Sequence, residues 1–370
     1  MDSGKTSRHI DSNTALYGLV GRPLAHTLGP RMHNAAFAAV GLNALYLAFE
    51  TRDIAGAVTG ARALNLQGLS VTLPYKTSVM EFLDQVDEMA RKIGAVNTIA
   101  RRGDLLVGFN TDAYGALKAL ETCLDPGALR GMPCLIVGAG GAARALGFTL
   151  ARNQAALAVS NRSRERGERL AKELDCPFLA EQEAWEFGAD LLVNATPVGM
   201  HPLADTCPVP DHVLRKGLVV MDLVYNPRDT LLLQKARARG CRTVSGLDMF
   251  IFQGAEQFRL WTGLEPPLEV MKTAVLEAIN LTHRALVAAA LADGRSRIID
   301  PLLCEDTMHT VNGLRTLGVP VDLREGEIIV QGTGGRFPAR SDPWDQLPLP
   351  VGRIGAGVRT TPSHWCPKDA

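Results

Sequence analysis

The segment with the clearest chemical meaning is residues 134–146, CLIVGAGGAARAL. Small and branched apolar residues lead into Gly138, Gly140 and Ala143, which are spaced as G-x-G-x-x-A, and an Ala/Leu-rich run follows. This pattern is typical of a strand, a tight turn and a helix. Gly138 suits the turn, Gly140 lets the main chain approach a pyrophosphate, and the small Ala143 lets the helix pack closely on its strand.

A single glycine-rich match also occurs in ordinary structural turns, so its context matters. Residues 155–160, AALAVS, predict a second strand after a gap of one helix length, as a dinucleotide-binding unit requires. The amides of Gly141 and Ala142 open the intervening helix and have no partners within it, so they would face phosphates. We therefore expect residues 138–142 to bind a dinucleotide.

The residues after the second strand indicate which dinucleotide is bound. NAD-binding proteins usually carry an acidic residue here for the ribose 2′-hydroxyl, whereas this chain has Asn161, Arg162 and Arg166. Cationic and hydrogen-bonding side chains suit a 2′-phosphate, which favours NADP over NAD as the cofactor. The alternative is an ordinary solvated, basic helix start.

A second set of chemistry-bearing residues precedes the nucleotide segment. Lys76 closes SVTLPYK (residues 70–76), just past the expected end of a parallel strand, where open α/β sheets place their ligands. Asn97 lies in GAVNT and Asp112 in GFNTDAYG. Taken singly, these are as readily a surface lysine and two turn formers. Their order together with NATPVGM (residues 194–200) and GLDMFIFQGA (residues 246–255) is specific.

The elements that must position these residues follow from hydrophobic periodicity. Expected strands at residues 16–20, 44–50 and 68–73 alternate with expected helices, and a helix is expected at residues 75–83, so the pattern predicts a largely parallel sheet. Residues 131–244 repeat the alternation in nucleotide-binding form. Two amphipathic helices are predicted at residues 246–261 and 269–280. Two helices are too few to form a domain of their own, so we expect them to pack back on the first sheet.

The predicted fold class is α/β, with a split N-terminal α/β substrate domain, an inserted NADP-binding Rossmann domain and a small C-terminal α/β extension. The expected substrate-binding and catalytic domain comprises residues 14–112 and 246–280. The Rossmann domain comprises residues 113–245 and the extension residues 281–335. Residues 336–370 are rich in Gly, Pro and Arg without periodicity, and we expect a poorly ordered tail.

Composition restricts the class of partner. The chain has 370 residues and a formal net charge of zero, and its cationic and anionic side chains are interleaved, so neither nucleic acid nor a membrane is an expected partner. Its seven cysteines are scattered without a C-x-x-C pair, which predicts neither a disulfide framework nor a metal site. We expect a cytoplasmic protein that acts on a small molecule; its oligomeric state stays open.

From residue 16 to residue 279 the chain resembles shikimate dehydrogenase, with all of these segments in the family's order. The resemblance implies reversible hydride transfer between NADPH and 3-dehydroshikimate, which gives shikimate in aromatic amino acid biosynthesis. One positioned acid/base must take up or return the hydroxyl proton in such a reaction.

The resemblance also implies a role for each matching residue. Lys76 and Asp112 match the catalytic pair. The matches to substrate-binding residues are Thr27, Thr72, Asn97, Tyr225 and Gln253. The implied cofactor-binding residues are Gly138, Gly140, Gly141, Ala142, Asn161, Arg162, Arg166, Asn194, Thr196 and Gly246.

Two positions depart from the family pattern. The family usually places two serines after an Ala-His pair to hold the substrate carboxylate, but this chain has Thr27 and Gly29 after Ala25-His26. Losing one hydrogen bond to a charged group costs about 1.5 to 3 kcal/mol. The departure leaves open a quinate/shikimate dehydrogenase of altered preference or a non-catalytic NADP- or metabolite-binding protein, and a water or the Gly29 amide offers a replacement donor. Ser70, where the family commonly has asparagine, is a milder departure.

Residues 282–335 carry a different resemblance, to part of the N-terminal region of enolpyruvyl-shikimate-phosphate synthase. Arg284 matches a residue of that family's site. The lysine-containing motif that should precede the match is replaced by EAIN at residues 277–280. We therefore expect an appended fragment without transferase activity, whose apolar faces pack on the dehydrogenase or mediate self-association.

Overall fold

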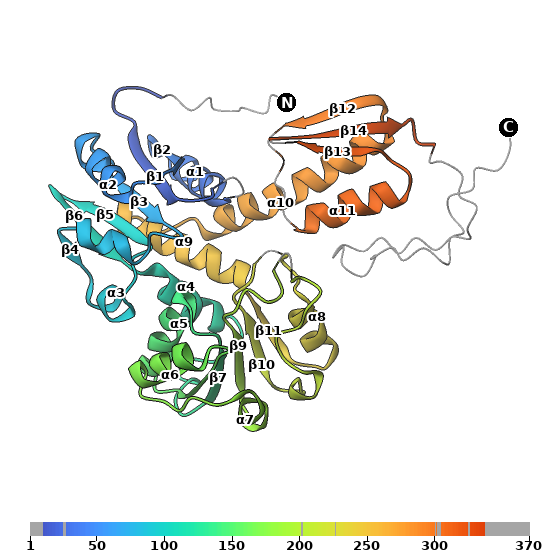
Figure 1. Cartoon of the computed structure of the whole chain (residues 1–370). Coiled ribbons are helices and arrows are strands. Elements are labelled where there is room, and N and C mark those ends of the chain that lie inside the picture. Colours follow the sequence, from blue (N-terminus) through green and yellow to red (C-terminus); the bar gives the residue numbers. More distant parts are fainter. Residues whose placement is uncertain are drawn as a thin grey trace. The chain divides into compact units, whose positions relative to one another are not determined.

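The computed structural model describes residues 10–24, 27–200, 203–225, 227–299, 301, 305–324 and 326–336 (Figure 1). Within that part of the chain, the first compact unit extends to His283 and the second comprises residues from Arg284 onward. Ala25 and His26, and residues 337–370 of the expected tail, lie outside the described residues.

The first unit begins with a six-stranded sheet in the order β2-β1-β3-β5-β6-β4. Its central strands are rich in branched and aromatic residues, and buried side chains such as Val20, Leu69 and Ile99 hold it against its helices. The sheet's strands are β1 (Ala15–Gly21), β2 (Ala44–Glu50), β3 (Gly68–Val71), β4 (Gln85–Val86), β5 (Thr98–Arg102) and β6 (Leu105–Phe109). The helices of this part are α1 (Gly29–Ala39), α2 (Ile54–Ala63), the 3-10 helix η1 (Ser78–Phe82) and α3 (Glu88–Ile93).

This sheet is more mixed than the expected, largely parallel one. Strands β1, β2 and β3 are parallel, but β5 pairs antiparallel with both β3 and β6. The short turn at Gly103 and Asp104 accounts for the antiparallel β5–β6 pair, because a turn of this length returns the chain antiparallel and leaves no room for a crossover helix. The α-helix expected at residues 75–83 is not present, because only the short 3-10 helix η1 forms there.

The inserted part carries an entirely parallel sheet in the order β11-β10-β9-β7-β8. Its strands read as continuous apolar runs and are buried, as expected of a parallel sheet covered on both faces. The strands are β7 (Pro133–Val137), β8 (Ala156–Ser160), β9 (Leu191–Asn194), β10 (Val219–Asp222) and β11 (Arg242–Ser245). The helices are α5 (Gly141–Arg152), α6 (Arg164–Glu173), α7 (Glu181–Glu186), the 3-10 helix η2 (Asp211–Val213) and α8 (Leu231–Ala238).

Helices α4 (Thr111–Leu120) and α9 (Gly246–Thr262) lie between the two sheets of this unit, and α10 (Leu268–Leu291) follows them. Apolar residues of α9 and α10, among them Phe258 and Met271, pack in one core with Tyr17 and Phe37 of the first sheet's layer. The helices therefore return to the first sheet, which confirms the predicted fold class with its inserted Rossmann unit.

Helices α4 and α9 approach each other closely at Gly115. A Cβ on Gly115 would lie 2.6 Å from the Met249 carbonyl oxygen and 2.7 Å from the Gln253 amide nitrogen. Only a glycine allows this approach, which brings the start of α4 next to the middle of α9.

The second unit is a three-stranded antiparallel sheet in the order β12-β14-β13, with α11 (Glu305–Thr316) and the last residues of α10. Its strands are β12 (Asp293–Ile299), β13 (Val321–Arg324) and β14 (Glu327–Thr333). Ile328 and Val330 of the central strand are fully buried, whereas Arg297 and Ile299 on β12 are exposed. The small α/β extension predicted from the sequence is thus present.

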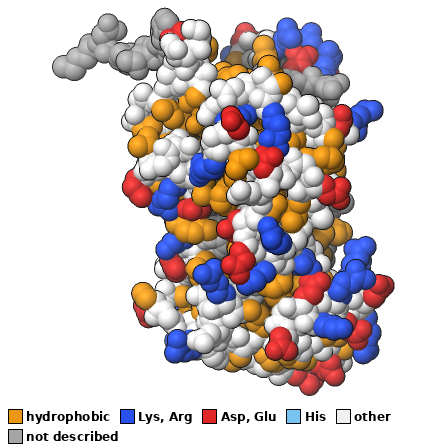
Figure 2. All heavy atoms as spheres, turned by 90° about the vertical axis from the view of Figure 1, so that its left-hand side faces the viewer, with side chains coloured by type: hydrophobic (Ala, Val, Ile, Leu, Met, Phe, Trp, Pro, Cys, Tyr) orange, Lys and Arg blue, Asp and Glu red, His pale blue; other side chains and the backbone are white. Residues whose placement is uncertain are grey.

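Two further observations bear on the expected partners. Helix α10 is long and apolar enough to span a membrane by length and composition, yet Met271, Val275 and Leu286 on it are fully buried in protein cores, as in a core helix. On the face shown in Figure 2, cationic and anionic side chains are interspersed over the whole surface. That face offers no concentrated basic patch for a nucleic acid.

Candidate active site

An ion pair between Lys76 and Asp112 is the centre of the site. The Lys76 Nζ donates to Asp112 Oδ2 at 2.7 Å, and the two side chains are 30% and 15% exposed. The other carboxylate oxygen, Oδ1, accepts a hydrogen bond from Asn97 Nδ2 at 2.9 Å. A partly accessible amine is therefore held by a carboxylate that is itself fixed in orientation.

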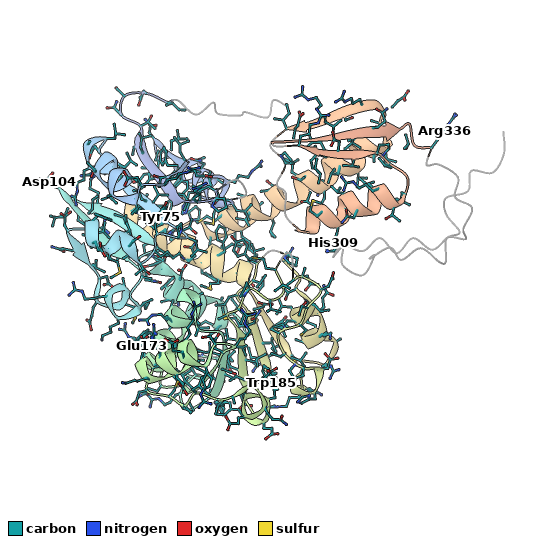
Figure 3. The ribbon with its side chains drawn as sticks, viewed as in Figure 1. Tyr75, Asp104, Glu173, Trp185, His309 and Arg336 are labelled. Atoms are coloured by element: carbon teal, nitrogen blue, oxygen red, sulfur yellow. The ribbon has the colours of Figure 1, made fainter. Side chains whose placement is uncertain are left out.

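The local structure explains why these residues meet. Lys76 follows strand β3 on a loop that is held by two contacts: the Lys76 carbonyl accepts from the Val96 amide at 2.7 Å, and the Tyr75 hydroxyl donates to the Thr51 carbonyl at 2.9 Å. Tyr75 is labelled in Figure 3, among the strand ends of the first sheet. Asp112 lies in the first turn of α4, whose N-cap Asn110 accepts from the Ala113 amide.

Asn97 is the hub of the cluster and is 2% exposed. Its Oδ1 accepts from the Thr111 amide at 2.7 Å and from the Thr98 hydroxyl at 2.8 Å, so its Nδ2 must face Asp112. Gln253 of α9 joins through its Oε1, which lies 3.3 Å from the Thr111 hydroxyl. A fully satisfied buried network of this kind holds its members in one arrangement before any ligand arrives.

A cavity of about 460 Å³ opens beside this cluster. It lies within the first unit, and both of that unit's sheets contribute to its wall, since Leu223 follows β10 and Ala142 opens α5. Its lining includes these predicted site residues: Thr27, Thr72, Lys76, Asn97, Asp112, Ala142, Tyr225, Gly246 and Gln253. Seven of the predicted catalytic and substrate residues thus share one cavity with two of the predicted cofactor residues.

The inner end of the cavity is lined by a second network, which the sequence analysis did not find. The Tyr46 hydroxyl donates to Ser70 Oγ at 2.8 Å, and Ser70 Oγ donates to Gln257 Oε1 at 3.0 Å. The same Gln257 oxygen lies 3.2 Å from His33 Nε2. All four side chains are buried. The sequence analysis named only Ser70 of these four residues. Tyrosine on a strand and histidine on an apolar helix face are typical core residues and gave no signal.

Burial also determines the protonation of two members of this network. Removal from water lowers the pKa of His33 to about 3 despite its hydrogen bond to Gln257, so the imidazole is neutral at physiological pH. The same cause raises the pKa of Tyr46, whose phenol stays protonated.

The glycine-rich turn is open where a phosphate would approach. Gly138 has a φ of +123°, and a Cβ there would lie 2.7 Å from the Ala195 carbonyl oxygen. Gly140, by contrast, is the N-cap of α5 without any side-chain cap, and no atom lies within 4 Å of a Cβ built on Gly140 or on Gly141. A ligand can therefore approach the main chain closely at the start of α5, as a bound pyrophosphate would require.

Cationic side chains stand beyond the end of β8. Arg162 and Arg166 are exposed, and neither forms an ion pair with any residue that the structure describes. Arg164 between them differs, since it pairs with Glu168. The Asn161 side chain donates to the Ser163 carbonyl at 2.8 Å and so shapes this loop. The guanidinium groups of Arg162 and Arg166, which have no ion-pair partner among the described residues, would suit a phosphate on the adenosine ribose.

The end of β9 and the loop after it carry two further residues predicted to bind the cofactor, Asn194 and Thr196. The Asn194 side chain accepts from the Thr196 amide at 3.0 Å and from the Thr196 hydroxyl at 2.7 Å, and it donates to Asp222 Oδ1 at 2.9 Å. Asp222 also accepts from Thr230 and from the Val224 amide. Burial outweighs these donors and raises the pKa of Asp222 from 3.8 to about 6. Asp222 is a buried ionisable group that the sequence analysis missed.

Curated relatives place the chain among known enzymes. A protein named shikimate dehydrogenase (NADP(+)) from Thermococcus kodakarensis is 45% identical over 278 residues, which cover 73% of this chain and 99% of the relative. A crystal structure of a shikimate dehydrogenase in complex with NADP+ superposes with a TM-score of 0.70 at 41% identity, over 74% of this chain and 99% of that one. The Thermus thermophilus enzyme, in complex with NADP(H) and shikimate, gives a TM-score of 0.67 at 38% identity, over 71% and 99%.

Family models match three parts of the chain. Residues 19–99 match the shikimate dehydrogenase substrate binding domain and residues 246–276 the shikimate 5′-dehydrogenase C-terminal domain. Residues 275–347 match EPSP synthase (3-phosphoshikimate 1-carboxyvinyltransferase). Both resemblances recognised from the sequence are therefore confirmed.

Proposed function

Because the chain belongs to the shikimate dehydrogenase family, we propose that it catalyses the NADP-dependent, reversible reduction of 3-dehydroshikimate to shikimate. The observation that carries this proposal is the Lys76–Asp112 pair, at 2.7 Å, in the wall of a cavity that also contains the start of the nucleotide-binding helix α5. The names of the relatives support the same substrate and cofactor.

Lys76 and Asp112 are proposed as the catalytic pair. During oxidation the substrate hydroxyl gives its proton to Lys76 Nζ, and the resulting ammonium is stabilised by Asp112 Oδ2. During reduction the Lys76 ammonium returns a proton to the developing alkoxide. Asn97 keeps the Asp112 carboxylate oriented through its 2.9 Å hydrogen bond, so the proton carrier is held in one place.

Bound NADP supplies or accepts the hydride at its nicotinamide ring. The residues proposed to hold it are Gly138, Gly140, Gly141 and Ala142 at the pyrophosphate, with Asn161, Arg162 and Arg166 at the 2′-phosphate. Asn194 at the end of β9, Thr196 just after it and Gly246 just after β11 are proposed to line the cofactor as well. Arg162 and Arg166 form no ion pair with any described residue and follow β8, where NAD-binding proteins usually carry an acidic residue, which supports NADP over NAD.

The polar side chains in the cavity wall are proposed to orient the substrate. We assign the ring hydroxyls to Asn97, Thr72 and Gln253, with Tyr225 covering the ring from the cofactor side. The carboxylate is assigned to Thr27, whose Oγ1 accepts from the Gly29 amide at 3.3 Å and so keeps its proton free to donate. The start of α1 adds a favourable partial positive charge there.

We further propose that the protein works in the cytoplasm, that residues 14–112 and 246–280 form the substrate domain, and that residues 113–245 form the cofactor domain. Residues 281–335 form an extension without transferase activity, because the chain matches only a part of the synthase and lacks the lysine motif before it.

Initial-rate measurements test this proposal. The purified chain is mixed with shikimate and either NADP or NAD, and reduction of the nicotinamide is followed by its absorbance. We expect saturable reduction with a clear preference for NADP. Binding of NADP without reduction of it, at any shikimate concentration, would instead identify a metabolite-binding protein.

A further inference from the structure

The side chain of Asn194 closes the loop that follows β9. Its Oδ1 accepts from the Thr196 amide and hydroxyl, and its Nδ2 donates to the Val198 carbonyl at 3.0 Å and to Asp222 Oδ1 at 2.9 Å. A flipped amide would set its donors against the Thr196 amide, so this orientation is fixed. Four hydrogen bonds exhaust an asparagine side chain, so Asn194 acts on a cofactor by shaping the loop that lines it.

This loop lies against the glycine-rich turn. The Ala195 amide donates to the Val137 carbonyl at 2.8 Å, and a Cβ built on Gly138 would lie 2.7 Å from the Ala195 carbonyl oxygen. The Thr196 hydroxyl, which donates to Asn194, also accepts from the Val198 amide at 3.2 Å. A shift of the loop would therefore move main chain that borders the proposed pyrophosphate site.

Asp222 holds the loop through one of its two oxygens. It is the last residue of β10, pairs in register with Asn194 of β9 and is fully buried. Oδ1 accepts from Asn194 Nδ2 at 2.9 Å and from the Val224 amide at 3.0 Å, whereas Oδ2 accepts from the Thr230 hydroxyl at 2.6 Å. Two N–H donors occupy Oδ1, so a proton on the carboxyl group would sit on Oδ2. Both contacts of Oδ1 therefore persist in either charge state.

The second donor to Oδ1 belongs to the wall of the substrate cavity. Val224 is buried and directly precedes Tyr225, which lines the cavity and stacks on Phe250 with ring centroids 5.5 Å apart. A Cβ built on Gly246 would lie 2.6 Å from the Leu223 carbonyl oxygen, so the same segment also packs tightly against the start of α9. One oxygen atom thus fixes main chain on the cofactor side and on the substrate side.

We propose that Asp222 is a positioning residue for the reaction, and that its Oδ1 holds the Asn194 loop against the cofactor and Tyr225 against the substrate. This inference rests on the proposed function, which assigns those two ligands. The role belongs to the acceptor atom and not to the charge, because Oδ1 accepts whether or not the carboxyl group is protonated. Without this acceptor, each ligand must order its own segment as it binds, which weakens the binding of both.

The test measures kcat and the KM values for NADP and for shikimate, each at a saturating concentration of the other. Asp222→Ala removes Oδ1 and should raise both KM values by about two- to tenfold, the effect of ordering one side chain on binding. Asp222→Asn keeps an acceptor oxygen at the same place, and its Nδ2 can donate to the Thr230 hydroxyl, so both KM values should stay as in the unaltered protein.

Thr230→Val is the matched control. It removes the donor to Oδ2 and the side-chain cap of α8, where Thr230 accepts from the Leu233 amide at 3.3 Å, but it leaves both contacts of Oδ1 in place. This variant should lose thermal stability and keep both KM values. A merely structural role of Asp222 would act in the same way: less folded protein lowers the apparent kcat and leaves both KM values unchanged.

Unchanged KM values in Asp222→Ala overturn the inference, as does a rise in only one of them or an equal rise in Asp222→Asn. If Asp222→Ala does not fold, Asp222→Ser is measured with the same expectation, since its hydroxyl is one bond shorter and cannot reach both donors. If the unaltered protein reduces no NADP with shikimate, the proposed function fails. Calorimetry with each ligand that the protein binds then decides the inference: Asp222→Ala must weaken that binding, and Asp222→Asn must not.

Discussion

The proposed active site has a substrate side and a cofactor side, which are built in opposite ways. On the substrate side, Lys76, Asp112 and Asn97 are bound to one another by side-chain hydrogen bonds and are partly or fully buried. On the cofactor side, the glycine turn presents bare main chain, and Arg162 and Arg166 extend into solvent. The substrate side is thus organised before binding, whereas the cofactor side completes its contacts only with the ligand.

The first prediction tests the preorganised side, where one substitution should affect the chemistry most. We expect Lys76→Ala to lower kcat by about 10²- to 10⁴-fold, because it removes the only proton carrier proposed for the reaction. Stopped-flow or steady-state reduction of NADP by shikimate measures the effect. The control is Lys118→Ala, which removes an exposed lysine paired with Glu121 on α4. Equal turnover of Lys76→Ala and the unaltered protein would remove Lys76 from the mechanism.

The second prediction separates structure from ligand contact within the glycine turn. Gly138→Ala combines a positive φ with a 2.7 Å approach to the Ala195 carbonyl, so we expect a loss of unfolding free energy of about 2 kcal/mol or more. Gly140→Ala meets no atom within 4 Å and should leave thermal stability almost unchanged while weakening NADP binding. Thermal unfolding with and without NADP distinguishes the pair.

Equal stability of the two variants would contradict the steric constraint at Gly138, and normal NADP binding by Gly140→Ala would contradict the proposed contact between the turn and the cofactor. The comparison depends on the backbone alone, since neither position carries a side chain in the unaltered protein.

The sequence alone predicts those parts of the molecule whose structure depends on neighbouring residues in one segment. Strand, turn and helix at Gly138 follow from the residues within one segment, and the fold class follows from the order of the elements. The meeting of Lys76, Asn97 and Asp112 required the order of several motifs, since no local pattern brings a loop after β3 next to the start of α4.

The inner end of the cavity could not be predicted, for a physical reason. Tyr46, His33 and Gln257 come from β2, α1 and α9, and each is an ordinary core residue in its own segment. Which of their atoms donate and which accept depends on proton positions that only the full set of partners defines. The antiparallel pairing of β5 with β6 was not predicted either, because the short turn at Gly103, and not the apolar pattern of the strands, sets the direction of β6.

The third prediction concerns the open side and its electrostatics. The double substitution Arg162→Ala with Arg166→Ala should lower kcat/KM for NADP by about tenfold to a hundredfold and leave NAD much less affected, because the lost contacts are to the 2′-phosphate. The loss should shrink as salt is raised, since both groups are exposed and screened. The control is Arg169→Ala, which removes an arginine already paired with Glu165. Equal losses for NADP and NAD would contradict the 2′-phosphate assignment.

The last prediction concerns Asp222, which links the Asn194 loop of the cofactor side to a buried network. Burial raises its pKa to about 6 in the folded protein against an ordinary value of 3.8, so the folded state holds this proton more tightly than the unfolded state does. Below pH 3.8 the Asp222 carboxyl is protonated in both states and does not change the unfolding free energy. As the pH rises from 3.8 to 6, the unfolded state ionises while the buried carboxyl still holds its proton, so stability is lost over this range and the loss is complete above pH 6.

We therefore expect the unfolding free energy of Asp222→Asn, relative to the unaltered protein, to rise by about 2 kcal/mol between pH 4.5 and pH 7.5. Asparagine keeps the shape but not the charge, so any constant loss from its altered hydrogen bonds to Thr230 and Val224 cancels in this difference between two pH values. Urea unfolding at each pH measures it. A relative stability that stays constant over this range would mean that Asp222 has the same pKa in both states, and that its three donors compensate its burial in full.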